Sequence, residues 1–101
     1  MLFALICKDK PGSLQVRLDT RPDHVAFLRG LSDAGTLKIA GPFLGDDGKP
    51  FGSLLVVEAA DKAEAASIGA EDPYAKAGLF ATVEVNAWNW TFNNPANPAN
   101  P

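Results

Sequence analysis

The sequence lacks most features of secreted, metal-binding and nucleic-acid-binding proteins. Its 101 residues include a single cysteine, Cys7, so no disulfide can form within the chain. No cysteine and histidine cluster has the spacing of a zinc site, and Asp46-Asp47-Gly48 lacks the further acidic residues of a calcium loop. We therefore expect no bound metal. Cys7 follows the apolar run Leu2–Ile6, which favours a small buried residue over a reactive thiol.

Positive charge is also scarce. Nine lysines and arginines stand against twelve aspartates and glutamates, which gives a formal net charge of −3. No basic stripe is visible along the chain, so the charge that neutralises phosphates in nucleic-acid binding is missing. A nucleic-acid partner is therefore not expected.

Long apolar stretches are missing as well. No segment approaches the roughly 20 apolar residues of a transmembrane helix. No basic segment precedes the first apolar run, as it would in a signal peptide. We expect a soluble, cytoplasmic protein that does not act at a membrane.

The length of the chain predicts one domain. Residues 1–92 carry the apolar pattern of a folded unit, whereas residues 93–101 repeat Asn-Pro-Ala and cannot build a core. We interpret residues 93–101 as a flexible Asn/Pro-rich tail.

The apolar periodicity predicts four strands and two main helices. The strands are expected at residues 2–7, 36–43, 52–58 and 79–87. A helical region covers residues 13–34, and the pattern allows a break at Pro22, which fits the first turn of a helix. Asp61 would cap a helix at residues 62–70, and a short helical turn follows Asp72. The order β-α-β-β-α-β is that of an α+β, ferredoxin-like domain with an antiparallel sheet.

The first and third strands predict a homodimer. Residues 2–7 and 54–57 are apolar at every position, so both faces of the sheet should be covered. Two helices can cover only one face. The most economical cover for the other face is the same sheet of a second copy, and we expect a homodimer through the sheet faces.

His24 is the chain's one histidine and the first candidate for proton transfer. We expect His24 in the first turn of the first main helix, where the helix dipole favours the neutral imidazole. The alternative is a histidine that packs on the apolar stripe of Phe27, Leu28 and Leu31 and bonds to backbone or water.

Asp72 is the candidate partner of His24. Asp-Pro is typical of a helix N-cap followed by its first residue, so capping alone could explain Asp72. The two roles are compatible, because a carboxylate that caps a helix can also fix the tautomer of an imidazole.

The other candidates are weaker. Arg17 and Arg21 could hold an anionic substrate or could be solvated surface residues. Ser53 opens a strand without a G-x-S-x-G motif, so it is not expected to be a nucleophile. The spacing of Trp88 and Trp90 favours a role in packing or at an interface over an aromatic site that encloses a ligand.

With these residues in view, the chain resembles the YCII-related (YciI-like) family of the dimeric α/β-barrel superfamily. The resemblance extends to about Trp90 and is strongest in the segment from Asp72 to Phe80. Further matching stretches are Arg21-Pro22-Asp23-His24, Phe27-Leu28, Ala40-Gly41-Pro42, Gly52-Ser53, Val83-Glu84-Val85 and Trp88.

The resemblance implies a dimer of ferredoxin-like subunits with a histidine–aspartate pair in a cleft, which maps to His24 and Asp72. We therefore expect a small enzyme that uses this pair for acid–base chemistry of the isomerase, lyase or hydrolase type. Its substrate would be a small polar or anionic metabolite, and no cofactor would be required. The candidate substrate-binding residues are Arg17, Arg21, Ser53 and Tyr74.

Two alternatives stay open. The chain could be a non-catalytic dimeric module that binds a small ligand or serves as a scaffold, with Asp72 acting only as a helix cap. A cofactor-free monooxygenase is suggested by the wider superfamily alone.

Overall fold

A computed structural model describes residues 1–95 of the chain. The described elements are β1 (Leu2–Asp9), α1 (Leu14–Asp33), β2 (Leu37–Leu44), β3 (Pro50–Glu58), α2 (Lys62–Ala70), α3 (Pro73–Lys76) and β4 (Phe80–Trp88). The four strands form one antiparallel sheet in the order β2-β3-β1-β4. The ferredoxin-like α+β fold is thus confirmed, with the first and third strands in the centre. Of the predicted tail, residues 96–101 lie outside the described residues.

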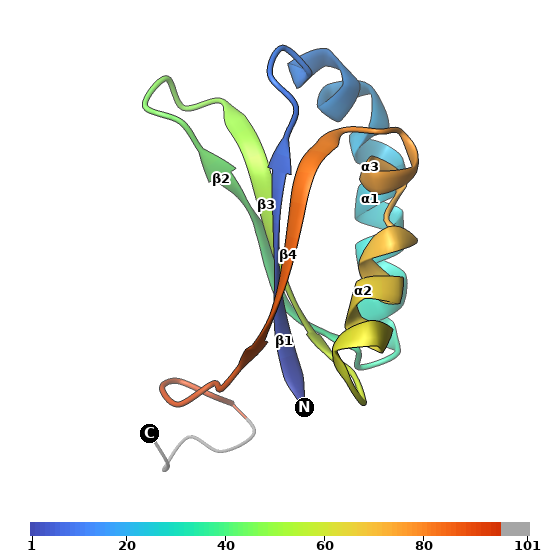
Figure 1. Cartoon of the computed structure of the whole chain (residues 1–101), viewed down its shortest axis with the longest axis vertical. Helices are drawn as coiled ribbons and strands as arrows, with labels where there is room; N and C mark the ends of the chain where they lie inside the picture. The colour runs from blue at the N-terminus through green and yellow to red at the C-terminus, as the bar shows by residue number, and fades with distance from the viewer. Residues whose placement is uncertain (96–101) are drawn as a thin grey trace.

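All three helices cover the same face of the sheet (Figure 1). Because side chains alternate along a strand, the odd-numbered residues of β1 and β3 point toward the helices. These residues form most of the buried core, which consists of Phe3, Leu5, Cys7, Leu55, Val57, Ala59 and Ala65. Cys7 is 3% exposed, which confirms the expected buried position.

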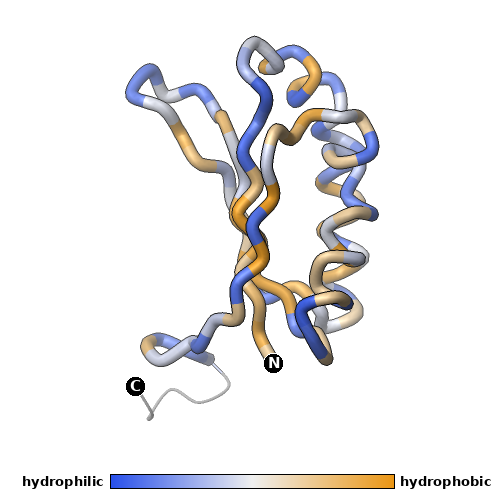
Figure 2. The backbone as a smooth tube through the Cα atoms, in the orientation of Figure 1, coloured by the Kyte–Doolittle hydropathy of each residue, from blue (hydrophilic) through white to orange (hydrophobic). Residues whose placement is uncertain are grey.

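The opposite face of the sheet carries no helix of the described chain (Figure 1). The even-numbered residues of the central strands lie on this face. The hydrophobic colour of the tube runs through the middle of the sheet, where these strands pair (Figure 2). We call the apolar residues on this side the open face: Leu2, Ala4, Ile6, Ile39, Phe43, Leu54 and Val56.

Helix α1 runs without a break from Leu14 to Asp33, with Pro22 inside it. The predicted break at Pro22 is therefore wrong. Proline has no amide hydrogen, so the carbonyl of Leu18 loses one helical hydrogen bond. None of the helices within residues 1–95 has the length and apolar character needed to cross a membrane.

Candidate active site

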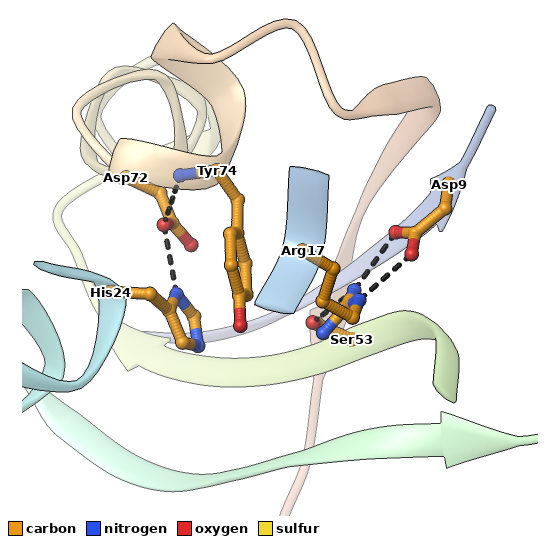
Figure 3. Close-up of polar contacts among 6 residues, drawn as sticks. All are labelled: Asp9, Arg17, His24, Ser53, Asp72 and Tyr74. Atoms are coloured by element: carbon orange, nitrogen blue, oxygen red, sulfur yellow. Dashed lines mark hydrogen bonds and ion pairs between the residues drawn. The ribbon is translucent and has the colours of Figure 1, made fainter. Parts of the chain in front are cut away.

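Asp72 links α3 to α1. It is the N-cap of α3, and its Oδ1 accepts a hydrogen bond from the backbone N–H of Tyr74 at 2.9 Å. The same Oδ1 lies 2.8 Å from Nδ1 of His24 (Figure 3). Asp72 is only 1% exposed and His24 8% exposed. Capping and contact with the histidine therefore occur together.

The position of His24 differs from the expected one. His24 lies in the middle of α1, which begins at Leu14, and not in the first turn of a helix. The dipole at a helix N-terminus acts within the first turn, so the expected dipole effect on His24 is wrong. Asp72 and Tyr74 of α3 are the groups that set its surroundings.

The contact with Asp72 fixes the hydrogen on the imidazole of His24. An ionised carboxylate only accepts hydrogen bonds, and Oδ1 of Asp72 already accepts one from Tyr74. Nδ1 of His24 therefore donates its hydrogen to Asp72. In the neutral ring this leaves Nε2, at the far end of the imidazole, without a hydrogen and able to accept a proton (Figure 3).

Tyr74 stacks on the imidazole ring of His24. Its ring lies 3.9 Å from the His24 ring between centroids, at an interplanar angle of 17°. The guanidinium carbon of Arg17 lies 4.6 Å from the centroid of the same ring. Tyr74 stands between His24 and Arg17 (Figure 3). Burial raises the pKa of Tyr74, although the positive charges of Arg17 and Arg21 act in the opposite direction.

Arg17 is held in place by β1 and β3. Its Nε and Nη2 donate to the two carboxylate oxygens of Asp9 at 2.7 and 2.8 Å, and Nη2 also donates to Oγ of Ser53 at 3.0 Å. Arg17 is 3% exposed, so a solvated surface position is wrong for this residue. Burial would lower the pKa of Arg17, but the hydrogen bond and charge of Asp9 outweigh it and raise the pKa above its ordinary value.

A cavity of about 310 Å³ lies between α1 and the β2–β3 hairpin. Five candidate residues line it: Arg17, Arg21, His24, Ser53 and Tyr74. Asp72 lies behind His24 and does not line the cavity. The rest of the wall is apolar or backbone and includes Leu28, Pro42 and Leu55. Arg21 is exposed, and no ion pair is formed by it within residues 1–95.

The sequence interpretation missed Asp9. It ended the first strand at Cys7, whereas β1 continues to Asp9. Alternation along the strand then puts Asp9 on the helix face with Phe3, Leu5 and Cys7. No group of three His, Cys, Asp or Glu within the described residues could hold a metal ion.

The family model of the YCII-related domain matches residues 1–89. The chain belongs to the YCII-related family. This YCII-related chain is 36% identical over 98 residues to Protein YciI of Escherichia coli O6:H1, a match that covers 91% of the chain and 100% of that protein. It is 32% identical over 98 residues to an uncharacterized protein of Haemophilus influenzae, with the same coverage of 91% and 100%.

Solved structures resemble the YCII-related chain as well. One is 5-chloro-2-hydroxyhydroquinone dehydrochlorinase (TftG) from Burkholderia phenoliruptrix, in complex with 2,5-dihydroxybenzoquinone. Its TM-score is 0.79 at 42% identity, and the match covers 88% of this chain and 94% of that one. A NIPSNAP family protein from Agrobacterium tumefaciens, with a TM-score of 0.53 at 20% identity and coverage of 93% and 95%, resembles it in fold alone.

Proposed function

We propose that this YCII-related protein is a small acid–base enzyme in which Nε2 of His24 moves a proton to or from a ligand in the cavity. The observation that carries the proposal is the 2.8 Å contact between Nδ1 of His24 and Asp72. A carboxylate at one imidazole nitrogen fixes the tautomer and makes the other nitrogen a stronger base. His24 lines the cavity, so this base has space for a ligand in front of it.

The ligand we propose is a single-ring hydroxylated compound, such as a hydroquinone or hydroxyquinone. A cavity of about 310 Å³ is at the small end of ligand pockets, which begin near 300 Å³. Its apolar wall suits a flat ring, and the cation of Arg21 suits an ionised hydroxyl. Support also comes from TftG, whose solved structure holds 2,5-dihydroxybenzoquinone.

The reaction class we propose is elimination or tautomerisation. Both require a base that removes a proton from an oxygen or a carbon of the ring, and in an elimination a leaving group departs with the electron pair. The name of TftG describes the loss of hydrogen chloride from a chlorinated hydroxyhydroquinone. His24 would accept the proton that such a step releases.

We also propose that a second copy of the chain covers the open face of the sheet. Ile39 on this face is 41% exposed, and Trp88 at the end of β4 is 37% exposed. An apolar sheet surface of this kind is unfavourable in water, and a two-fold axis would place two such surfaces against each other.

The proposal is tested with 5-chloro-2-hydroxyhydroquinone as substrate and chloride release as the readout. His24→Gln should lower kcat by about 100-fold or more, because positioned acid–base groups contribute factors of this size. Arg29→Met, which alters an exposed arginine on α1, should leave kcat unchanged. Equal chloride release by wild type and His24→Gln would contradict the role of His24.

A non-catalytic ligand-binding module is the second candidate, because the N-cap bond to Tyr74 alone would justify the burial of Asp72. Titration with 2,5-dihydroxybenzoquinone distinguishes the two. Binding by wild type without turnover of the chlorinated compound would favour the binding module over the enzyme.

A further inference from the structure

We propose that Arg17 is a positioning residue that holds the ring of Tyr74 flat against the imidazole of His24. The inference rests on the proposed function, because it explains how Nε2 of His24 is aimed into the cavity. It gives Arg17 a role that is exerted through Tyr74.

The first observation is that the hydrogen-bond donors of Arg17 are largely used inside the protein. A bidentate contact with Asp9 and a bond to Ser53 occupy Nε and Nη2. The side chains of Arg17 and Asp9 are 4% and 7% exposed, so this ion pair is enclosed. A planar guanidinium fixed by a two-bond contact has a defined plane and cannot turn freely.

The second observation is the order of the three groups. Arg17, Tyr74 and His24 form a stack, with the tyrosine ring in the middle (Figure 3). A cation over an aromatic face is attracted by the ring, and the attraction is larger where water is excluded. Tyr74 is 2% exposed, so the contact with Arg17 is of the enclosed kind.

The third observation concerns what His24 needs. One hydrogen bond at Nδ1 restrains the imidazole but does not by itself fix the plane of the ring. The face of Tyr74, 3.9 Å away and nearly parallel, sets the plane of the ring. The direction of Nε2 then follows from Asp72 and Tyr74 together, and Arg17 fixes Tyr74 from behind.

The charges of the stack are consistent with this role. Asp9 neutralises Arg17, so the cation does not oppose a positive charge on His24 during proton transfer. Arg21, which has no carboxylate partner among the described residues, is the cavity cation left for an anionic ligand. The two arginines lie one helical turn apart on α1 and have different roles.

The test uses NMR of the imidazole of His24, because the chain has one histidine and its ring signals can be assigned without ambiguity. Protons above the face of an aromatic ring are shifted upfield, so the His24 ring protons should be upfield in the wild type. Arg17→Met should move them downfield toward the values of an unstacked imidazole. Arg29→Met is the control and should leave them unchanged.

The double variant Asp9→Asn/Arg17→Met removes the buried pair without leaving an unpaired charge, and it covers the case in which Arg17→Met does not fold. It should show the same downfield movement. Retention of the wild-type shifts in a folded Arg17 variant would overturn the proposal.

A second readout uses the chain's one tyrosine, followed by the absorbance of its phenolate. Loss of the Arg17 cation should raise the pKa of Tyr74 further, because this cation acts to lower it. Neither readout depends on turnover. Failure of the enzymatic proposal would therefore appear in the chloride assay alone, and failure of the positioning role in these spectra.

Discussion

At the scale of single residues, Asp72 joins two functions in one carboxylate oxygen. Oδ1 caps α3 through Tyr74 and also accepts from His24, so the residue that caps α3 also holds the histidine of the proposed acid–base pair. The pair is thereby tied to a backbone contact rather than to a mobile side chain. Any shift of the first turn of α3 would move the carboxylate away from the imidazole.

Asp72→Asn should separate the proposed catalytic role of this residue from its capping role. Asparagine is as good an N-cap as aspartate, and its Oδ1 can accept the same two hydrogen bonds, but it lacks the negative charge that makes the other imidazole nitrogen a stronger base. We expect a loss of kcat of about 100-fold or more with a small change in Tm. Chloride release and thermal unfolding measure the two effects.

Asp61→Asn is the matched control, since Asp61 caps α2 through the backbone N–H of Glu64 at 2.8 Å and lies on the surface. It should leave kcat at the wild-type value. Similar losses of kcat in both variants would show that Asp72 acts only as a cap.

Cys7 gives a pH dependence of stability. Burial, with a further contribution from Asp72, raises the pKa of the Cys7 thiol from 9.0 to about 12. Above pH 9 the unfolded chain releases this proton while the folded chain retains it. The free energy of unfolding should therefore fall as pH rises from about 9 to about 12, by at most about 1.4 kcal/mol per pH unit.

Urea unfolding at several pH values measures this slope. Cys7→Ala lacks the thiol and should show a shallower decline over the same range. Equal slopes in the two proteins would contradict the raised pKa of Cys7.

At the scale of elements, the continuous helix α1 brings the site together. Arg17, Arg21 and His24 follow one another at spacings of four and three residues, which places them on one face of a helix. The break predicted at Pro22 separated Arg17 from His24 and concealed this pattern. Proline lowers the preference for helix locally, but the contacts of α1 with α3 and the sheet outweigh that cost.

Pro22→Ala tests whether α1 is one helix. Alanine would restore the bond to the carbonyl of Leu18 and remove the proline penalty of about 3 kcal/mol. Greater freedom of the unfolded chain offsets up to about 1 kcal/mol, so the free energy of unfolding should rise by about 2 kcal/mol. Denaturant unfolding of wild type and Pro22→Ala measures this change in the free energy of unfolding. A decrease would favour a helix that begins at Pro22.

The strands were more predictable than the site. The apolar runs of β1 and β3 and the alternation in β4 predicted the sheet and its central strands, because burial dictates these patterns. The contact of His24 with Asp72 joins residues 48 positions apart, so the sequence could offer Asp72 as a candidate partner but its spacing could not show the contact. Asp9 was missed because a charged residue after an apolar run also fits the end of a strand.

At the scale of the whole molecule, helices cover one side of the sheet (Figure 1), and the other side carries the apolar residues of the open face. The cavity lies on the helix side, so a second copy on the open face would leave the cavity accessible. The proposed acid–base site would therefore be built within one chain, and the proposed dimer would stabilise the sheet beneath it.

Leu54→Lys should prevent association. It places a charge in the middle of β3 on the open face, where a partner sheet would take it out of water. Size-exclusion chromatography with light scattering should show a dimer for the wild type and a monomer for Leu54→Lys. Val16→Lys, on the exposed side of α1, should stay dimeric. A monomeric wild type would contradict the dimer.

The central claim is that Asp72 holds His24 with its hydrogen on Nδ1 and leaves Nε2 free as the base. Nitrogen-15 NMR of the imidazole tests it directly, because the chain has one histidine and the two nitrogens differ strongly in chemical shift when one carries a hydrogen. In the neutral ring we predict a protonated Nδ1 and an unprotonated Nε2. A hydrogen on Nε2, with Nδ1 unprotonated, would contradict the account.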